Sequence, residues 1–242
     1  MKGRRARPGL EKEAFDVYHP DNQTRMIGLL DGPEPAEGIG TLADFLYEVG
    51  HLKSTPRSGW ALAGVPAPES VADHAYRTAV IGVVLAELEG ADVGRTAVIC
   101  LMHDIAETRM GDIPSVGKSY VRTVRDTDVA ADQTRGVSGS LAELVCDAVA
   151  EYTERVSIES VLAKDADTLE CLAQAREYVA AGYPRAEHWV QDLVRGLRSH
   201  SAKRIAAAMR AGAPENWWLP FVQGYSDTPE ELDEEYADAS AA

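Results

Sequence analysis

The residues best suited to chemistry lie together in one short stretch, residues 99–112. An apolar run there leads into an adjacent His103–Asp104 pair, Glu107 follows four residues after the histidine, and Asp112 comes directly after a glycine. We expect this stretch to form one buried helix that ends at the glycine. Ionisable groups in an apolar helix cost free energy unless a partner neutralises them. A divalent cation is such a partner, because imidazole and carboxylate donors suit Zn, Mn, Fe or Co better than calcium.

Helical geometry limits how one ion could serve both residues of the pair. Adjacent helical residues project about 100° apart, so His103 and Asp104 both reach one ion only at the edge of the helix. Glu107 would lie beside that ion, four residues after the histidine and three after the aspartate. A buried histidine satisfied by its neighbouring aspartate is the structural alternative, and a His–Asp pair on its own favours it.

The turn-rich loop of residues 53–60 contains two further candidates, Arg57 and Trp60. In a structural interpretation the arginine lies on the surface and the tryptophan fills the core. In a functional interpretation the arginine binds phosphate and the tryptophan forms a wall beside a base or a sugar. Composition alone does not favour either interpretation.

Two predicted helices carry polar side chains in apolar surroundings. His74 lies in the first turn of a helix that begins after Ser70, where a bond to a nearby carbonyl explains a histidine most simply. Lys164, Asp165 and Asp167 lie in mid-helix, where an internal Lys–Asp pair needs no ligand to explain it. Asp165 and Asp167 point about 200° apart on a helix, so only one of them could face an ion.

Apolar residues at helical spacing, many alanines and few aromatic residues predict an all-α fold. The helix after Ser70 is apolar nearly all round, which predicts a central position. The polar segment 120–139 leaves its helical character open. We expect helices over residues 41–52, from 70 onward, 92–111, 141–155, 157–182, 186–198 and 202–210, with Thr41, Ser70, Asp92 and Ser157 as N-terminal caps.

The 242 residues are enough for one domain with a sizeable core. Residues 1–40 are polar and punctuated by Pro and Gly, which predicts a flexible N-terminal extension. Residues 41–222 form the predicted helical domain. Residues 223–242 form a predicted acidic C-terminal tail, because seven carboxylates follow Ser226 without a basic residue.

The overall charge excludes some classes of partner. The chain has 39 acidic and 24 basic side chains and a formal net charge of −15, so we expect no binding to nucleic acid or to anionic membranes. Cys100, Cys146 and Cys171 are odd in number and widely spaced, which is typical of reduced cysteines in a cytoplasmic protein. With no secretory signal and no apolar run of 18 residues, the sequence predicts a soluble, cytoplasmic protein.

The order and spacing of His74, the His103–Asp104 pair and Asp167 resemble the metal site of HD-domain phosphohydrolases. The resemblance covers residues 41–178, whereas the loop 119–139 and both ends of the chain depart from the pattern. Five sequence blocks carry it and are most similar to the 5′-deoxynucleotidase branch, the HD-domain-containing protein 2 type: Pro56–Trp60, Pro68–His74, His103–Glu107 with Gly111–Asp112, Glu151–Tyr152 and Lys164–Asp167.

The resemblance implies an all-α HD-domain helical bundle that holds one divalent metal ion, with Mn, Co, Fe, Zn or Mg as the options. The implied ligands are His74, His103, Asp104 and Asp167. The family's Lys-x-x-Asp spacing, counted from Lys164, selects Asp167 over Asp165. Two imidazoles and two carboxylates leave positions open for water and a phosphate oxygen, as in catalytic sites.

The resemblance also implies roles for the remaining candidates. Glu107 would orient or deprotonate the attacking water, and Asp112 would protonate the departing nucleoside 5′-oxygen. The substrate-binding candidates are Arg57 as a phosphate clamp, Trp60 as a wall for the base or sugar, and Arg77 and Lys118 as further phosphate contacts.

The function implied is a metal-dependent 5′-nucleotidase that hydrolyses (deoxy)nucleoside 5′-monophosphates to nucleoside and phosphate, acting as a homodimer on a small nucleotide substrate. One alternative is an HD-domain phosphohydrolase for another small phosphorylated metabolite or a modified nucleotide. The other is a non-catalytic HD domain that binds a nucleotide.

Overall fold

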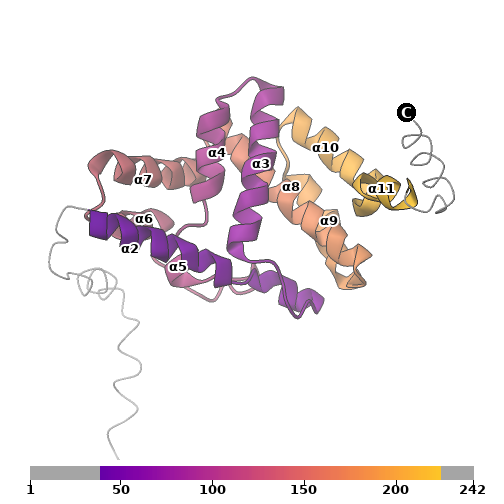
Figure 1. Ribbon diagram of the computed structural model, residues 1–242, viewed down its shortest axis with the longest axis horizontal. Coiled ribbons are helices and arrows are strands. Elements are labelled where there is room, and N and C mark those ends of the chain that lie inside the picture. Colours follow the sequence, from indigo (N-terminus) through magenta and orange to yellow (C-terminus); the bar gives the residue numbers. More distant parts are fainter. Residues whose placement is uncertain (1–38, 225–242) are drawn as a thin grey trace, which may run out of the picture.

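Helices α3 and α4 lie side by side at the centre of the structure, and α8 packs against both (Figure 1). Helices α6 and α7 lie on one side of this centre and α9 to α11 on the other. The computed structural model describes residues 39–224. Within that range it contains ten α-helices, five 3-10 helices and no β-strand, which confirms the all-α prediction.

The α-helices are α2 (Ile39–Gly50), α3 (Val71–Glu89), α4 (Val93–Met102), α5 (Glu107–Met110), α6 (Asp126–Gln133), α7 (Gly139–Glu154), α8 (Ile158–Ala180), α9 (Glu187–Leu193), α10 (His200–Ala211) and α11 (Leu219–Gly224). The 3-10 helices are η3 (His51–Ser54), η4 (Ser58–Ala63), η5 (Pro184–Ala186), η6 (Val194–Gly196) and η7 (Pro214–Trp217). Most of the predicted extension (1–40) and of the predicted acidic tail (223–242) lies outside the described residues. Among the described helices, none has the length and apolarity needed to cross a bilayer.

The capping residues fix where most of the central helices begin. The side chain of Ser70 accepts a hydrogen bond in a complete capping box at the start of α3. The side chains of Asp92 and Ser157 accept equivalent bonds at the starts of α4 and α8. These three predictions are confirmed. The prediction for Thr41 is wrong, because α2 begins two residues earlier and Thr41 lies inside it.

The helix predicted over residues 92–111 is instead two helices joined by a turn at the His–Asp pair. Helix α4 ends one residue before the pair, and α5 begins only at Glu107. The side chain of His103 gives a physical reason. Its Nδ1 lies 2.7 Å from the carbonyl oxygen of Cys100, the oxygen that the N–H of Asp104 would use in a continuing α-helix. The expected helical register between His103 and Glu107 is therefore wrong.

Part of the polar segment 120–139 forms helix α6. Arg109 of α5 donates to Glu48 of α2 at 2.6 Å and forms an ion pair with Asp132 of α6. Because one guanidinium contacts carboxylates from two helices, α5 and α6 are both tied to α2.

The core centres on α3, α4 and α8. Its fully buried side chains include Leu85, Ile99, Leu162 and Leu169. Helix α3 is central, as predicted, but one face of it is uncovered. The exposed residues on that face are Tyr76, Val80, Val84 and Leu88, spaced one helical turn apart.

Gly82 lies where α3 closely approaches α4. A Cβ atom at this position would lie 2.6 Å from the Sγ of Cys100 and 3.3 Å from the methyl group of Thr96. Overpacking costs about 1–3 kcal/mol, whereas replacing a helical glycine by alanine returns about 1 kcal/mol. We therefore expect Gly82→Ala to lower the free energy of unfolding by up to about 2 kcal/mol, measured by chemical denaturation.

Gly94 provides the matched control, because it lies at an exposed position of α4. Gly94→Ala meets no atom closer than 3.4 Å and should raise the free energy of unfolding by about 0.5–1 kcal/mol. Adding Cys100→Ala to Gly82→Ala removes the sulfur that clashes and should recover part of the loss. Equal stability of the Gly82→Ala and Gly94→Ala variants would contradict the close-packing explanation.

Candidate metal centre

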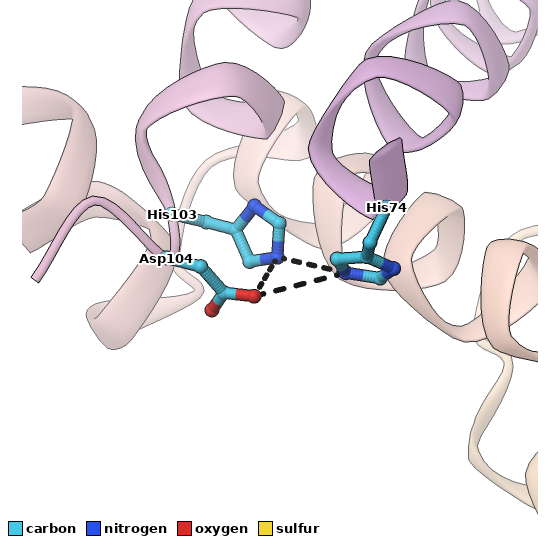
Figure 2. Close-up of side chains that lie close together, drawn as sticks. All are labelled: His74, His103 and Asp104. Atoms are coloured by element: carbon cyan, nitrogen blue, oxygen red, sulfur yellow. Dashed lines mark hydrogen bonds and ion pairs between the residues drawn. The ribbon is translucent and has the colours of Figure 1, made fainter. Parts of the chain in front are cut away.

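The four predicted metal ligands lie together although three separate segments carry them. Nε2 of His74, in the first turn of α3, lies 3.3 Å from Nε2 of His103 and 3.7 Å from Oδ2 of Asp104 (Figure 2). Nε2 of His103 lies 3.0 Å from the same Asp104 oxygen. From α8, Oδ1 of Asp167 comes within 3.3 Å of Nε2 of His74. A nitrogen of His103 and one oxygen each from Asp104 and Asp167 therefore lie within 3.7 Å of Nε2 of His74.

These separations fit a single divalent ion. Donor atoms held about 2.1 Å from a metal at tetrahedral or octahedral angles lie about 3.0–3.4 Å from one another. The shortest separations in the cluster, 3.0–3.3 Å, fall in this range. His74, His103 and Asp104 form a group whose donor atoms could hold a metal ion, and Asp167 forms another such group with His74 and Cys171.

The far sides of both imidazoles are fixed by hydrogen bonds. Nδ1 of His103 must carry its proton, because its partner at 2.7 Å, the carbonyl of Cys100, can only accept. Nδ1 of His74 lies 2.5 Å from Oε2 of Glu170, a carboxylate oxygen that likewise accepts a hydrogen bond. These bonds leave the Nε2 lone pairs for a metal, the arrangement typical of metal-ligating histidines.

Arg77 does not have the position of a phosphate contact, which corrects the sequence-based suggestion. Its Nε donates to Oε1 of Glu170 at 2.9 Å, its Nη1 to Glu177 at 2.6 Å and its Nη2 to Gln174 at 2.7 Å. Each guanidinium nitrogen already has a partner from α8. Arg77 therefore neutralises the fully buried Glu170, which in turn holds His74.

The two mid-helix aspartates have different surroundings. Asp165 accepts hydrogen bonds from the backbone N–H groups of Arg198 at 2.9 Å and Ser199 at 2.7 Å, where α10 begins. Its carboxylate therefore fixes the start of α10. The structure brings Asp167, and not Asp165, to His74.

The charges in the cluster compensate one another. Although burial opposes ionisation, His103, Arg57 and His74 hold the pKa of Asp104 well below its ordinary value. Burial also disfavours a charged His74, but hydrogen bonds to Asp167 and Glu170 raise its pKa to about 10. The carboxylates thus favour a cation at Nε2 of His74, and a metal ion there would replace a proton.

A cavity of about 600 Å³ opens beside the cluster and includes His103, Asp104 and Asp167 in its wall. Its basic lining residues are Arg57, Lys118, Arg155 and Lys164. Two of them contact the candidate ligands. Nη1 of Arg57 lies 3.4 Å from Oδ2 of Asp104, and Nζ of Lys164 donates to Oδ2 of Asp167 at 2.6 Å. Nη2 of Arg57 also lies 3.3 Å from Sγ of Cys171. Lys118 is exposed on the rim.

Trp60 satisfies both interpretations that the sequence left open. It is buried, its indole N–H donates to Glu69 at 3.0 Å, and its ring packs against Tyr178 and Trp189. It also lines the cavity. A core residue therefore forms part of the cavity wall.

Glu107 and Asp112 both line the cavity, but their surroundings differ. Burial, followed by repulsion from Asp104 and Asp112, raises the pKa of Glu107 to about 8. Its Oε2 is buried and has no hydrogen-bond partner among the described residues. Asp112 is held by Ser58, whose N–H donates to Oδ2 at 2.6 Å. A cation at the neighbouring cluster would favour the charged form of Glu107.

Glu170 and Tyr152 support the cluster, although no sequence pattern assigned them a role. The phenol of Tyr152 donates to Oδ2 of Asp167 at 2.6 Å. Glu170 follows Asp167 by three residues, just as Arg77 follows His74 by three. This spacing puts a ligand and its supporting residue on one helix face, and a glutamate within an apolar helix was the signal available.

We expect Glu170→Gln to weaken metal binding about 10- to 100-fold, because the neutral amide removes the negative charge that makes His74 a stronger ligand. Titration of the metal-free protein with Mn²⁺ or Co²⁺ measures this change. Glu177→Gln is the matched control, since it removes a carboxylate from the outer end of the same Arg77 group. Equal affinities for the two variants would argue against a role for Glu170 in the metal centre.

Comparison with known proteins agrees with this geometry. The HD-domain family matches residues 49–209. The 5′-deoxynucleotidase HDDC2 of Danio rerio is 32% identical over 143 residues, which are 58% of this chain and 70% of that protein. HDDC2 of Homo sapiens is 33% identical over the same shares. A conserved hypothetical protein from Pyrococcus furiosus, whose structure is solved, is 32% identical with a TM-score of 0.58, covering 70% of this chain and 99% of that one. The chain therefore belongs to the HD-domain family and is related to its 5′-deoxynucleotidases.

Proposed function

We propose that this chain is a metal-dependent 5′-nucleotidase that hydrolyses (deoxy)nucleoside 5′-monophosphates to nucleoside and phosphate. The observation that carries the proposal is the cluster that His74 forms with His103, Asp104 and Asp167, the last three of which line a cavity together with Arg57, Glu107 and Asp112. The relationship to the 5′-deoxynucleotidases HDDC2 supports the choice of substrate class.

A divalent ion held by His74, His103, Asp104 and Asp167 would lower the pKa of water and neutralise charge that develops on the phosphoryl oxygens. Arg57 adds a fixed positive charge beside Asp104, with a planar guanidinium suited to two phosphate oxygens. In a chain of net charge −15, such local cations are needed to hold an anionic substrate.

Glu107 and Asp112 divide the proton transfers between them. Glu107 takes a proton from the attacking water, for which its buried, unpartnered oxygen is available. Asp112 gives a proton to the departing 5′-oxygen, and Ser58 keeps that carboxyl group at the cavity wall. Hydrolysis needs one carboxyl group charged and the other protonated at the start.

A specific observation favours a second candidate, a phosphohydrolase for another small phosphorylated metabolite or a modified nucleotide. Val121, Thr123 and Asp126 line the cavity, and they come from the loop 119–139 that departs from the family pattern. This loop would therefore contribute to the choice of substrate. The homodimer remains a prediction, for which the uncovered apolar face of α3 is a suitable surface.

We expect the purified chain with Mn²⁺ or Co²⁺ to release phosphate from deoxynucleoside monophosphates such as dAMP or dUMP, and a chelator to stop the release. His103→Ala should lose both bound metal and at least about 99% of the activity, because it removes a ligand. Phosphate release and metal content are the two measurements. His51→Ala, at an exposed histidine in η3, is the matched control.

Several outcomes would overturn this proposal. A His103→Ala variant that is fully active without metal would refute the metal centre. Inert deoxynucleotides together with cleavage of another phosphate monoester would favour the second candidate. Tight nucleotide binding without phosphate release under any divalent metal would favour the non-catalytic alternative.

We expect Glu107→Gln to retain metal but to lower kcat about 100-fold or more, because proton transfer by a positioned group contributes about 10²–10⁴-fold. Glu143→Gln, at an exposed position of α7, is the control for loss of a carboxylate. Metal content and steady-state rates are measured together. If Glu107→Gln also loses the metal, Glu107 is a ligand and its assignment as the water-activating base fails.

A further inference from the structure

The carboxylate of Asp167 presents its two oxygens to different neighbours. Oδ1 lies 3.3 Å from Nε2 of His74, within the candidate metal centre. Oδ2 accepts a hydrogen bond from the phenol of Tyr152 at 2.6 Å and another from the ammonium group of Lys164 at 2.6 Å. One oxygen is therefore available to a cation, whereas the other already has two donors.

Tyr152 is fixed by contacts on several sides. Its ring centroid lies 4.9 Å from that of His103. The cationic groups of Lys164 and Arg155 lie 5.7 Å and 5.9 Å from the ring centroid, within the range of cation–π attraction. Lys164 also lies three residues before Asp167, on the same face of α8. The phenol thus links α7 to ligands from two other segments.

A carboxylate can bind a cation through one oxygen or chelate it through both. Chelation by Asp167 would require Oδ2 to give up two charge-assisted hydrogen bonds, which are roughly twice as strong as neutral ones. We propose that Tyr152 and Lys164 are positioning residues that restrict Asp167 to ligation through Oδ1 alone. This inference rests on the metal centre of the proposed function.

Ligation through Oδ1 alone would determine how many coordination positions of the metal remain free for solvent and substrate. With one donor atom from each of the four ligands, an octahedral ion keeps two positions for solvent and substrate. Chelation by Asp167 would close one of them. Tyr152 and Lys164 would therefore preserve a position that hydrolysis needs, although neither binds the metal itself.

The test uses the full chain, stripped of metal and titrated with Mn²⁺. Affinity is followed by the electron paramagnetic resonance signal of free Mn²⁺, and the number of coordinated waters by water-proton relaxation. We expect Tyr152→Phe to bind one Mn²⁺ with one coordinated water fewer than the unmodified chain, and to lose about 10- to 100-fold in kcat. Lys164→Gln should change the water count and kcat in the same direction. The double variant should also lack one water, because Asp167 has only one further oxygen to offer.

Tyr47→Phe is the matched control, because it removes a phenol hydroxyl from an exposed position of α2. Lys164→Arg should restore the unmodified water count, since it keeps a donor cation. If circular dichroism finds Tyr152→Phe unfolded, Lys164→Gln carries the test, because that side chain is 37% exposed.

An unmodified water count and Mn²⁺ affinity in the folded Tyr152→Phe and Lys164→Gln variants would overturn the inference. If the unmodified chain binds Mn²⁺ but releases no phosphate from any nucleotide, the proposed function fails, and the water counts still test the role of Tyr152. If the unmodified chain binds no Mn²⁺, both fail.

Discussion

Compensation of buried charge is the constraint on which this structure depends. Taking an ionised group out of water costs several kcal/mol, and the centre of this bundle contains buried carboxylates and imidazoles. Three of the carboxylates have a cation beside them: Arg77 lies beside Glu170, Lys164 beside Asp167 and Arg57 beside Asp104. The positions of α3, α4 and α8 are therefore set by matching charges as well as by apolar packing.

The ionisable residues around the cluster fall into two groups: those that support a candidate ligand and those that face the cavity and could react. Arg77 and Glu170 act behind His74, away from the cavity, whereas Arg57, Glu107 and Asp112 face it. The turn at His103 contributes to this division. Because α4 stops there, the His103–Asp104 pair lies in a turn, and Glu107 is not in the position that a continuous helix would give it.

Local signals in the sequence were sufficient to predict most of the helices and where the central ones begin. Ser70 and Ser157 act through neighbours three residues away, so their capping roles could be predicted. The break after α4 could not be predicted, because hydrophobic periodicity carries no information about a side chain that competes for a backbone carbonyl.

Features that depend on distant residues were the hardest to predict. The partners of Arg77 lie on α8, more than 90 residues away, so the sequence could not distinguish a structural arginine from a phosphate ligand. The candidate metal ligands could be proposed only because a family resemblance supplied the long-range pairing that spacing lacks. Trp60 fitted two interpretations because a side chain at the edge of a core also borders the cavity.

The wide separation of the ligands along the chain has a consequence for folding. His74 and His103 are 29 residues apart, and Asp167 follows much later. An unfolded chain has no preformed site, so a bound ion would join three distant segments and add its binding free energy to that of the native state. At an ion concentration 100 times the dissociation constant this contribution is about 2.7 kcal/mol. Metal supply would then govern how long the molecule survives heat, as well as whether it can react.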